Sequence, residues 1–167
     1  MGLAGLSALG FNNPPSGKRV LIIAETDGCF LDGLSAATEC TPGHRTLRIE
    51  DYGKTAAIFV DTATGKTVRL SPLLDLRARA GVFVPDEPKR YLAQLRAYMD
   101  MPGEEMFTIS SVHLKTPIEV IVSRPKVRVA CASCGEEVIN ERTTQQGGRE
   151  VCLSCAHGGY YTPVGLP

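Results

Sequence analysis

The carboxyl-terminal stretch CASCGEEVINERTTQQGGREVCLSC limits the possible folds of this chain more than any other part of its sequence. It holds two Cys-x-x-Cys pairs, and seventeen residues separate Cys134 from Cys152. Two such pairs at this distance are typical of four-cysteine zinc sites, in which each pair occupies one side of the ion. Gly135 permits a tight turn whose amides donate hydrogen bonds to sulfur. We therefore predict a zinc ribbon or finger with Cys131, Cys134, Cys152 and Cys155 as ligands.

Two disulfides, four buried thiols or a redox-active pair are the other interpretations of these cysteines. The chain starts without a basic segment, and Asn12 and Asn13 interrupt its apolar run after about ten residues, unlike a secretion signal or a membrane span. We therefore expect a cytoplasmic protein with reduced thiols and no membrane partner. The second matching pair argues against a redox motif. Because four thiolates saturate a tetrahedral ion, we expect the zinc to be structural.

The charge pattern gives little support to nucleic-acid binding. Basic and acidic residues are equal in number, 18 each, so no overall field attracts phosphates. From Arg124 onward there are five basic and four acidic residues, and a zinc ion with four thiolates brings this tail to about −1. A basic stripe for phosphate contacts is missing. We expect His157, Tyr160 and Tyr161 to cover the zinc site, although a ribbon module that binds protein or nucleic acid stays an alternative.

The rest of the chain alternates strand and helix patterns, which predicts an α+β fold with an antiparallel sheet packed against helices. Strands are expected at 20–24, 46–49, 56–61, 67–70 and 106–114. Helices are expected at 1–9, after an N-cap at Asp32, at 73–82 and from Pro88 onward. The last of these helices has an apolar face formed by Tyr91, Leu95 and Tyr98 or by Leu92, Leu95 and Met99. The composition changes at Ser123-Arg124-Pro125, which predicts domains at 1–123 and 124–167.

Two further cysteines lie in the segment ETDGCFLDGLSAATECTPGHRTL. Cys29 and Cys40 are eleven residues apart without paired spacing, so the residues alone favour buried thiols over a site. His44 follows Pro-Gly and is expected to be an exposed loop residue. Asp27 and Asp32 are expected to serve as a turn residue and a helix cap.

The order of the motifs nevertheless resembles the E-subunit family of formylmethanofuran dehydrogenase. The resemblance runs through ETDGCFLDG, ATECTPGHRTL, LRIEDYGKTAAIFVDTATGK and a carboxyl-terminal CxxCGE…CxxCA…GYY finger, so it covers nearly the whole chain. It implies an α+β domain that often forms dimers through exchanged elements, with a metal or reactive-thiol site in a cleft. In many members it also implies an appended zinc finger.

The resemblance assigns positions within this cleft. The family's cysteine-aspartate element matches Cys29 and Asp32, and its TGC element matches Thr38 and Cys40, but Glu39 stands where the family usually has glycine. Members normally carry an FHGHxCPG-like stretch that supplies histidine and cysteine. This chain begins beyond that stretch, so we interpret its first domain as truncated relative to the family.

The three histidines of the chain, His44, His113 and His157, do not replace the missing ligands by position. A metal held by the remaining residues is therefore expected to bind only weakly. Cys40, Cys29 and His44 are the candidate residues of a second site, which would hold a second metal ion of unidentified kind.

These observations lead to one main functional hypothesis and leave alternatives open. The resemblance implies a zinc-binding accessory or metal-handling protein linked to molybdenum or tungsten enzymes, with such an enzyme and a second copy of the chain as partners. An alternative is a thiol- or metal-dependent enzyme that uses Cys40 as its catalytic residue, which requires a low thiolate pKa. The sequence does not decide whether the chain is an enzyme.

Overall fold

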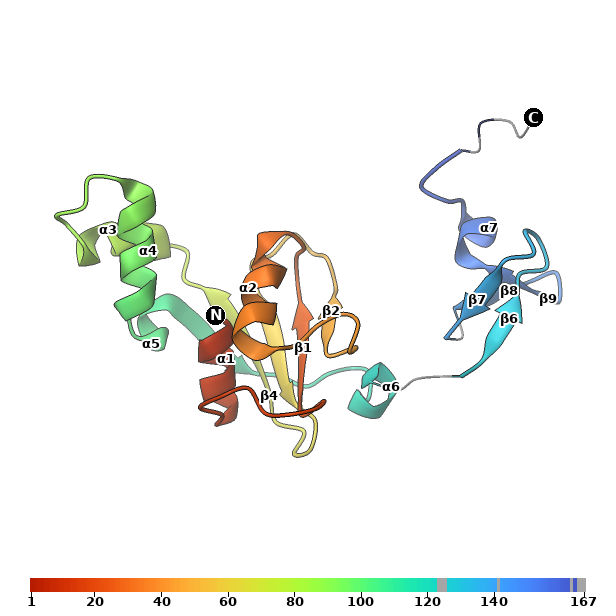
Figure 1. The fold of residues 1–167 in the computed structure, drawn as a ribbon, viewed down its shortest axis with the longest axis horizontal. Coiled ribbons are helices and arrows are strands. Elements are labelled where there is room, and N and C mark those ends of the chain that lie inside the picture. The colour runs from red at the N-terminus through yellow and green to blue at the C-terminus, as the bar shows by residue number, and fades with distance from the viewer. Residues whose placement is uncertain (123–125, 141, 163, 165–167) are drawn as a thin grey trace. The chain divides into compact units, whose positions relative to one another are not determined.

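The computed structural model describes residues 1–122, 126–140, 142–162 and 164. The chain divides into two compact units, Met1–Val122 and Ser123–Pro167, each described here by itself. Both contain strands and helices (Figure 1), as expected of an α+β protein. None of the helices in the described ranges has the length and hydropathy of a membrane-spanning segment.

The larger unit is built on a five-stranded sheet in the order β2-β1-β3-β4-β5. Its strands are β1 (Val20–Ala24), β2 (Leu47–Ile49), β3 (Ala57–Asp61), β4 (Thr67–Pro72) and β5 (Phe107–Ser111). Three neighbouring pairs are antiparallel, as predicted, but β1 and β2 are parallel because α2 (Cys29–Thr38) crosses between them. The predicted strand at 106–114 is shorter than expected, since Met106 ends the one-turn helix α5 (Gly103–Met106).

One face of the sheet is covered by α1 (Gly2–Leu9) and α2 (Figure 1). Apolar side chains on this face form the main core: Leu6, Leu9, Val20, Ile22, Ala24, Leu34, Cys40, Leu47, Ala57, Phe59, Val68, Leu70 and Phe107. Gly5 lets α1 approach closely, because a β-carbon at this position would lie 2.4 Å from the Phe59 ring. A smaller cluster on Leu21, Ile23 and Val60 packs against α6 (Ile118–Val122), which the sequence did not predict.

The start of α2 corrects one sequence expectation. The helix begins at Cys29 with Gly28 as its N-cap, so Asp32 is an exposed residue of the first turn and the predicted cap at Asp32 is wrong. Gly28 has a φ of 78°, a conformation that glycine adopts at little cost. This backbone allows the helix to start four residues earlier than a cap at Asp32 indicated, because the N-cap is Gly28.

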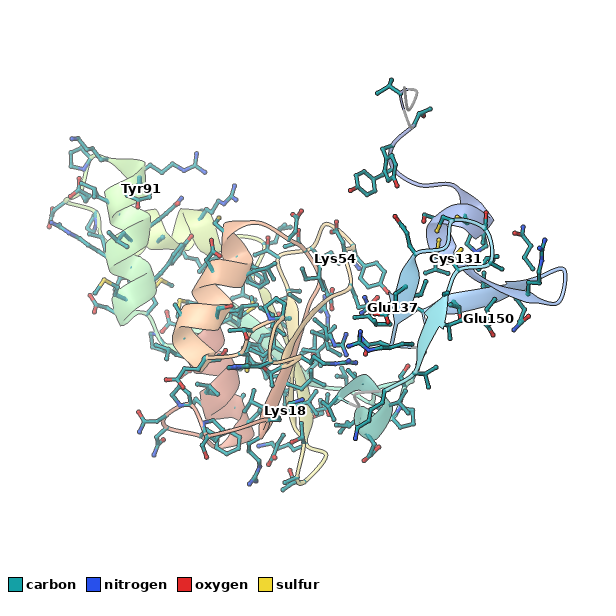
Figure 2. All side chains as sticks on the ribbon, turned by 45° about the vertical axis from the view of Figure 1, so that its right-hand side comes forward. Lys18, Lys54, Tyr91, Cys131, Glu137 and Glu150 are labelled. Atoms are coloured by element: carbon teal, nitrogen blue, oxygen red, sulfur yellow. The ribbon has the colours of Figure 1, made fainter. Side chains whose placement is uncertain are left out.

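Helices α3 (Leu76–Phe83) and α4 (Arg90–Asp100) form a hairpin. Their contact uses the small residues Ala80 and Ala97, together with Leu76 and Met101. The predicted apolar face of α4 does not face the core, since Tyr91 is 74% exposed and Leu95 48% exposed. Figure 2 labels Tyr91 near the start of this helix.

The smaller unit contains two short antiparallel hairpins and a terminal helix. Strand β6 (Arg128–Ala130) pairs with β7 (Glu137–Ile139), and β8 (Thr143–Gln146) pairs with β9 (Arg149–Cys152). Helix α7 (Leu153–His157) follows β9 directly. Among the described residues of this unit, Cys131 and Val151 are the buried hydrophobic ones, so apolar burial contributes little to its stability.

Candidate metal centre and the cysteines of the larger unit

The two Cys-x-x-Cys pairs lie in turns that local hydrogen bonds define. Cys131 and Cys134 lie in the turn between β6 and β7, where the Gly135 amide donates to the Cys131 carbonyl at 2.9 Å. Gly135 has a φ of 76°, which explains the glycine that follows the first pair. Cys152 ends β9 and Cys155 lies in the first turn of α7. The sequence thus places two sulfur atoms on each of two adjacent turns.

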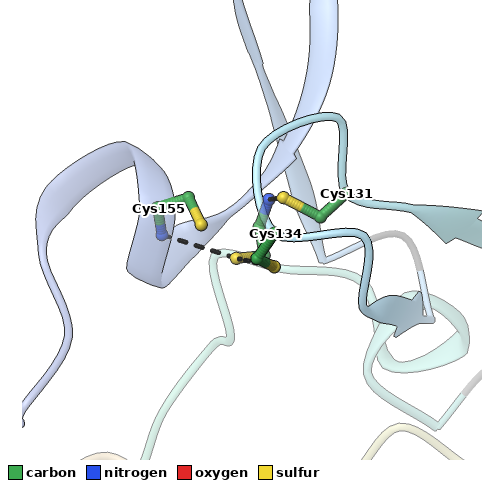
Figure 3. A group of neighbouring side chains, drawn as sticks. Cys131, Cys134 and Cys155 are labelled. Atoms are coloured by element: carbon green, nitrogen blue, oxygen red, sulfur yellow. Dashed lines mark hydrogen bonds between the residues drawn. The ribbon is translucent and has the colours of Figure 1, made fainter. Parts of the chain in front are cut away.

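The four sulfur atoms converge, and those of Cys131, Cys134, Cys152 and Cys155 all lie within 4.8 Å of one another. The Sγ atoms of Cys134 and Cys152 are 4.0 Å apart. Figure 3 shows the labelled side chains of Cys131, Cys134 and Cys155 pointing toward a common point. A tetrahedral ion with metal–sulfur bonds of about 2.3 Å needs sulfur–sulfur distances of about 3.8 Å. A contraction of about 1 Å or less therefore brings these thiols to coordination distance.

Backbone amides point at two of these sulfur atoms. The amides of Ser133 and Cys152 donate to Cys131 Sγ at 3.4 and 3.3 Å. The amide of Cys155 donates to Cys152 Sγ at 3.4 Å. Such bonds stabilise thiolates and orient ligands around a metal. The Cys131 sulfur is also buried, with 2% of the residue exposed.

The thiol pKa values within the cluster diverge. Backbone amides, that of Cys134 first and then that of Cys152, lower the pKa of the Cys131 thiol to about 6. At Cys134 the Glu136 amide acts to lower the pKa, but the Cys131 thiol and burial outweigh it and raise the pKa to about 12. The first thiolate thus opposes ionisation of the next, which is the repulsion that a divalent cation removes. The donor set fits a thiophilic metal ion.

Within the part of the chain that the structure describes, a metal ion can be held where three or more His, Cys, Asp or Glu side chains lie close enough together. These four cysteines form such a group. Four thiols fill all positions of a tetrahedral ion and leave none for substrate. The geometry therefore suits a structural metal site.

The structure does not bring together the two cysteines of the larger unit. Cys29 begins α2 and is exposed, whereas Cys40 follows the end of the same helix and is buried. A rise of 1.5 Å per residue over this ten-residue helix separates them by about 15 Å. They cannot bind one ion in this arrangement.

Cys40 lies in an environment that disfavours a reactive thiolate. Only 4% of the residue is exposed, and its Sγ donates to the Val20 carbonyl at 3.5 Å. Burial raises the pKa of the Cys40 thiol, although the hydroxyls of Thr38 and Thr46 act in the other direction. His44 is exposed, and together with Cys40 it lines a pocket of about 200 Å³. A role of Cys40, Cys29 or His44 in a second site stays a prediction, with Cys29 and Cys40 of one chain not on the same ion.

Comparison with known proteins adds the decisive observation. The model of the family described as "FmdE, Molybdenum formylmethanofuran dehydrogenase operon" matches residues 1–108. The chain belongs to the FmdE family. The resemblance to the E-subunit family of formylmethanofuran dehydrogenase is thereby confirmed, and the match covers most of the larger unit.

A solved structure supports the fold of this FmdE protein. It is described as a tungsten formylmethanofuran dehydrogenase E-subunit (FmdE)-like protein from Syntrophus aciditrophicus, with a TM-score of 0.59 at 22% identity. The match covers 96% of this chain and 92% of that one. At this identity it shows a shared fold.

A curated relative, described as a probable S-adenosyl-L-methionine-binding protein of Archaeoglobus fulgidus, is 29% identical over 168 residues. That alignment covers 89% of this FmdE chain. It spans only 43% of the relative's length.

Sequence reasoning missed a group of cations in the larger unit. Lys54, Arg69 and Arg77 line one cavity, and Arg69 forms a bidentate ion pair with the buried Glu25. These residues lie on a loop, a strand and a helix. No local motif links them, so only the strand register and the position of the hairpin bring them together.

Proposed function

We propose that this FmdE protein binds a structural zinc ion through Cys131, Cys134, Cys152 and Cys155. The observation that carries this proposal is the convergence of four sulfur atoms within 4.8 Å. Four thiolates in two Cys-x-x-Cys turns are a donor set that zinc prefers over harder cations. We further propose that residues 1–123 are the FmdE-like domain and residues 124–167 the zinc finger, in a cytoplasmic protein with reduced thiols.

Elemental analysis of the purified, reduced full chain tests the zinc assignment. We expect one zinc per chain, released quantitatively when a mercurial blocks the thiols in the presence of a colorimetric zinc indicator. A chain with all six thiols free and less than about 0.1 equivalent of any transition metal, even after dialysis against zinc, contradicts the proposal. Stoichiometric iron in place of zinc contradicts the metal identity alone.

We propose an accessory or metal-handling role beside a molybdenum or tungsten enzyme for the larger unit. The support is the family's description, which names a molybdenum formylmethanofuran dehydrogenase operon, and the likeness to the Syntrophus protein. The buried Cys40 with its raised thiol pKa gives no support to a thiol enzyme. A purified formylmethanofuran dehydrogenase and this chain are expected to co-elute in size-exclusion chromatography at micromolar concentration. Separate elution at 50 μM and low salt removes this role.

We also propose that the chain forms a homodimer through the outer side of α4. Apolar side chains are exposed along this helix at Tyr91 (74%), Leu95 (48%) and Met99 (77%). Contiguous exposed apolar patches are a feature of protein–protein interfaces. We expect light scattering to give a dimer for the wild type and a monomer for L95E/M99E. The control R90E, at an exposed polar position of the same helix, stays dimeric, and a monomeric wild type refutes the proposal.

A further inference from the structure

A cavity of about 760 Å³ lies in the larger unit, where the α3–α4 hairpin meets β4 and β5. Its lining comes from both helices, from both strands and from the segment 54–56. This volume falls within the range of pockets that hold small ligands. The cavity is separate from the four-cysteine cluster, which lies wholly in the other unit.

The charged side chains that line this cavity are all cationic. Lys54, Arg69 and Arg77 line it, and its lining contains no Asp or Glu. Glu25 is not part of the lining; it forms an ion pair with Arg69 and also attracts Lys54 electrostatically, so it balances one of the three charges. Within the described ranges, the side chains of Lys54 (labelled in Figure 2) and Arg77 make no hydrogen bond or ion pair. Two cationic groups are therefore available for a ligand.

Arg69 is held in a fixed orientation. Its Nε donates to Glu25 Oε1 at 2.5 Å and its Nη2 donates to Glu25 Oε2 at 2.7 Å. The Arg69 guanidinium lowers the pKa of this carboxyl, so Glu25 stays ionised at neutral pH. The remaining nitrogen, Nη1, has no partner among the described residues, so a fixed donor is left beside the cavity. A preoriented guanidinium loses little freedom when it binds an anion.

Apart from the neutral polar side chains of Thr55, Ser71 and Gln94, the remaining wall is apolar and contains aromatic rings. Phe30, Tyr98 and Phe107 line the cavity together with Leu73 and Leu76. A cavity with several apolar side chains and a few charged groups is the usual design of a site for small organic ligands. An ionic group alone would leave these rings unused, and a purely apolar ligand would leave the cations unused.

We propose that this cavity binds a small organic anion that joins a carboxylate or phosphate group to an apolar or aromatic part. Lys54 and Arg77 attract the anionic group, Arg69 orients it, and the rings enclose the rest of the ligand. A metal ion does not fit, since the lining offers no carboxylate, imidazole or thiol. This inference goes beyond the proposed zinc and accessory roles and depends on neither.

Fluorescence titration with 8-anilinonaphthalene-1-sulfonate, an aromatic anion, tests the inference on the zinc-containing full chain. The chain has no tryptophan, so the probe signal is free of indole transfer. One charge at about 4 Å in water changes affinity roughly fivefold, so we expect K54Q and R77Q each to weaken binding about fivefold and the double variant about 25-fold. The matched control K89Q/R90Q removes two exposed charges outside the cavity lining and leaves the affinity within twofold.

A neutral probe separates the cavity from an ordinary apolar patch. N-phenyl-1-naphthylamine has the same ring system without the anionic group, and we expect it to bind at least tenfold more weakly. Equal affinity of both probes, or equal affinity of wild type and K54Q/R77Q for the anion, overturns the proposal. Phenylacetate and benzyl phosphate compete with the anionic probe, and the stronger competitor identifies the preferred anionic group. Failure of both to compete at 10 mM also overturns it, while the zinc content measured on the same samples tests the zinc proposal separately.

Discussion

Replacing Cys131 by serine is expected to unfold the smaller unit and leave the larger one intact. Cys131 is the most buried cysteine of the cluster and receives two amide hydrogen bonds. With Val151 it makes up the buried hydrophobic residues in the described part of this unit. Units of this size with so little apolar burial need a metal or disulfides to fold. Fold and metal are therefore expected to be lost together.

The magnitude follows from the free energy of structural zinc. Apparent binding free energies of about 10–16 kcal/mol are typical of folded four-ligand zinc sites at neutral pH. The larger unit, in contrast, keeps its own sheet and core, with thirteen buried side chains in the main cluster. C131S is thus expected to remove almost all zinc and to abolish amide protection in the smaller unit, with less than about 0.5 kcal/mol change in the larger one.

Hydrogen exchange followed by mass spectrometry, combined with zinc analysis, measures both effects on one sample. Peptides from 126–140 and 142–162 are expected to exchange fully within seconds in C131S, whereas those from 20–24 and 57–61 keep wild-type protection. C29S is the matched control, because Cys29 is exposed in the larger unit. One equivalent of zinc in C131S, or a metal-free wild type with normal protection in 126–162, refutes the reasoning.

Three further predictions concern the larger unit. G5A is expected to destabilise it by about 1–2 kcal/mol in urea unfolding, because the new β-carbon clashes with the Phe59 ring and the gain in helix propensity offsets only part of this cost. Cys40 is expected to resist alkylation by iodoacetamide at pH 8 until the chain unfolds, because burial raises its thiol pKa. The Arg19 guanidinium lowers the pKa of the Asp61 carboxyl, so stability is expected to fall as the pH drops below about 4. R19Q is expected to destabilise the larger unit at neutral pH and to flatten this pH dependence, which urea unfolding at several pH values measures.

Each of these predictions has a control within the same unit. G33A adds the same methyl group in α2, where nothing lies within 4 Å, and is expected to stabilise by about 0.5–1 kcal/mol. Exposed Cys29 is expected to react with iodoacetamide in the native chain, and equal rates for Cys40 contradict its burial. In R19Q, Asp61 still accepts bonds from the Thr64 hydroxyl and the Ala63 amide, so part of the acid sensitivity remains. An unchanged acid profile in R19Q contradicts the role of Arg19.

The clustering of the four cysteines was predictable because its information is local. Each Cys-x-x-Cys pair lies in one turn, and a glycine after the first pair marks the backbone that the turn needs. The strand at Val20–Ala24 was equally predictable, since all five residues are apolar or small and all five are buried. The prediction that Cys29 and Cys40 belong to one second site depended instead on where helix α2 starts. A start at Cys29 rather than after Asp32 places a complete helix between Cys29 and Cys40.

The pair of Glu25 and Arg69 shows why the cavity was not predictable from local patterns. In the sheet, Ile23 lies beside Ile58, and Ile58 lies beside Arg69. Since side chains alternate along a strand, Glu25 points to the same face as Ile23, diagonally across from Arg69. A shift of one residue in either pairing would turn Arg69 to the other face and leave Glu25 buried without a partner. The ion pair therefore favours the observed register. In this register Arg69 lines the cavity beside the α3–α4 hairpin. The sequence alone shows only an arginine in a predicted strand.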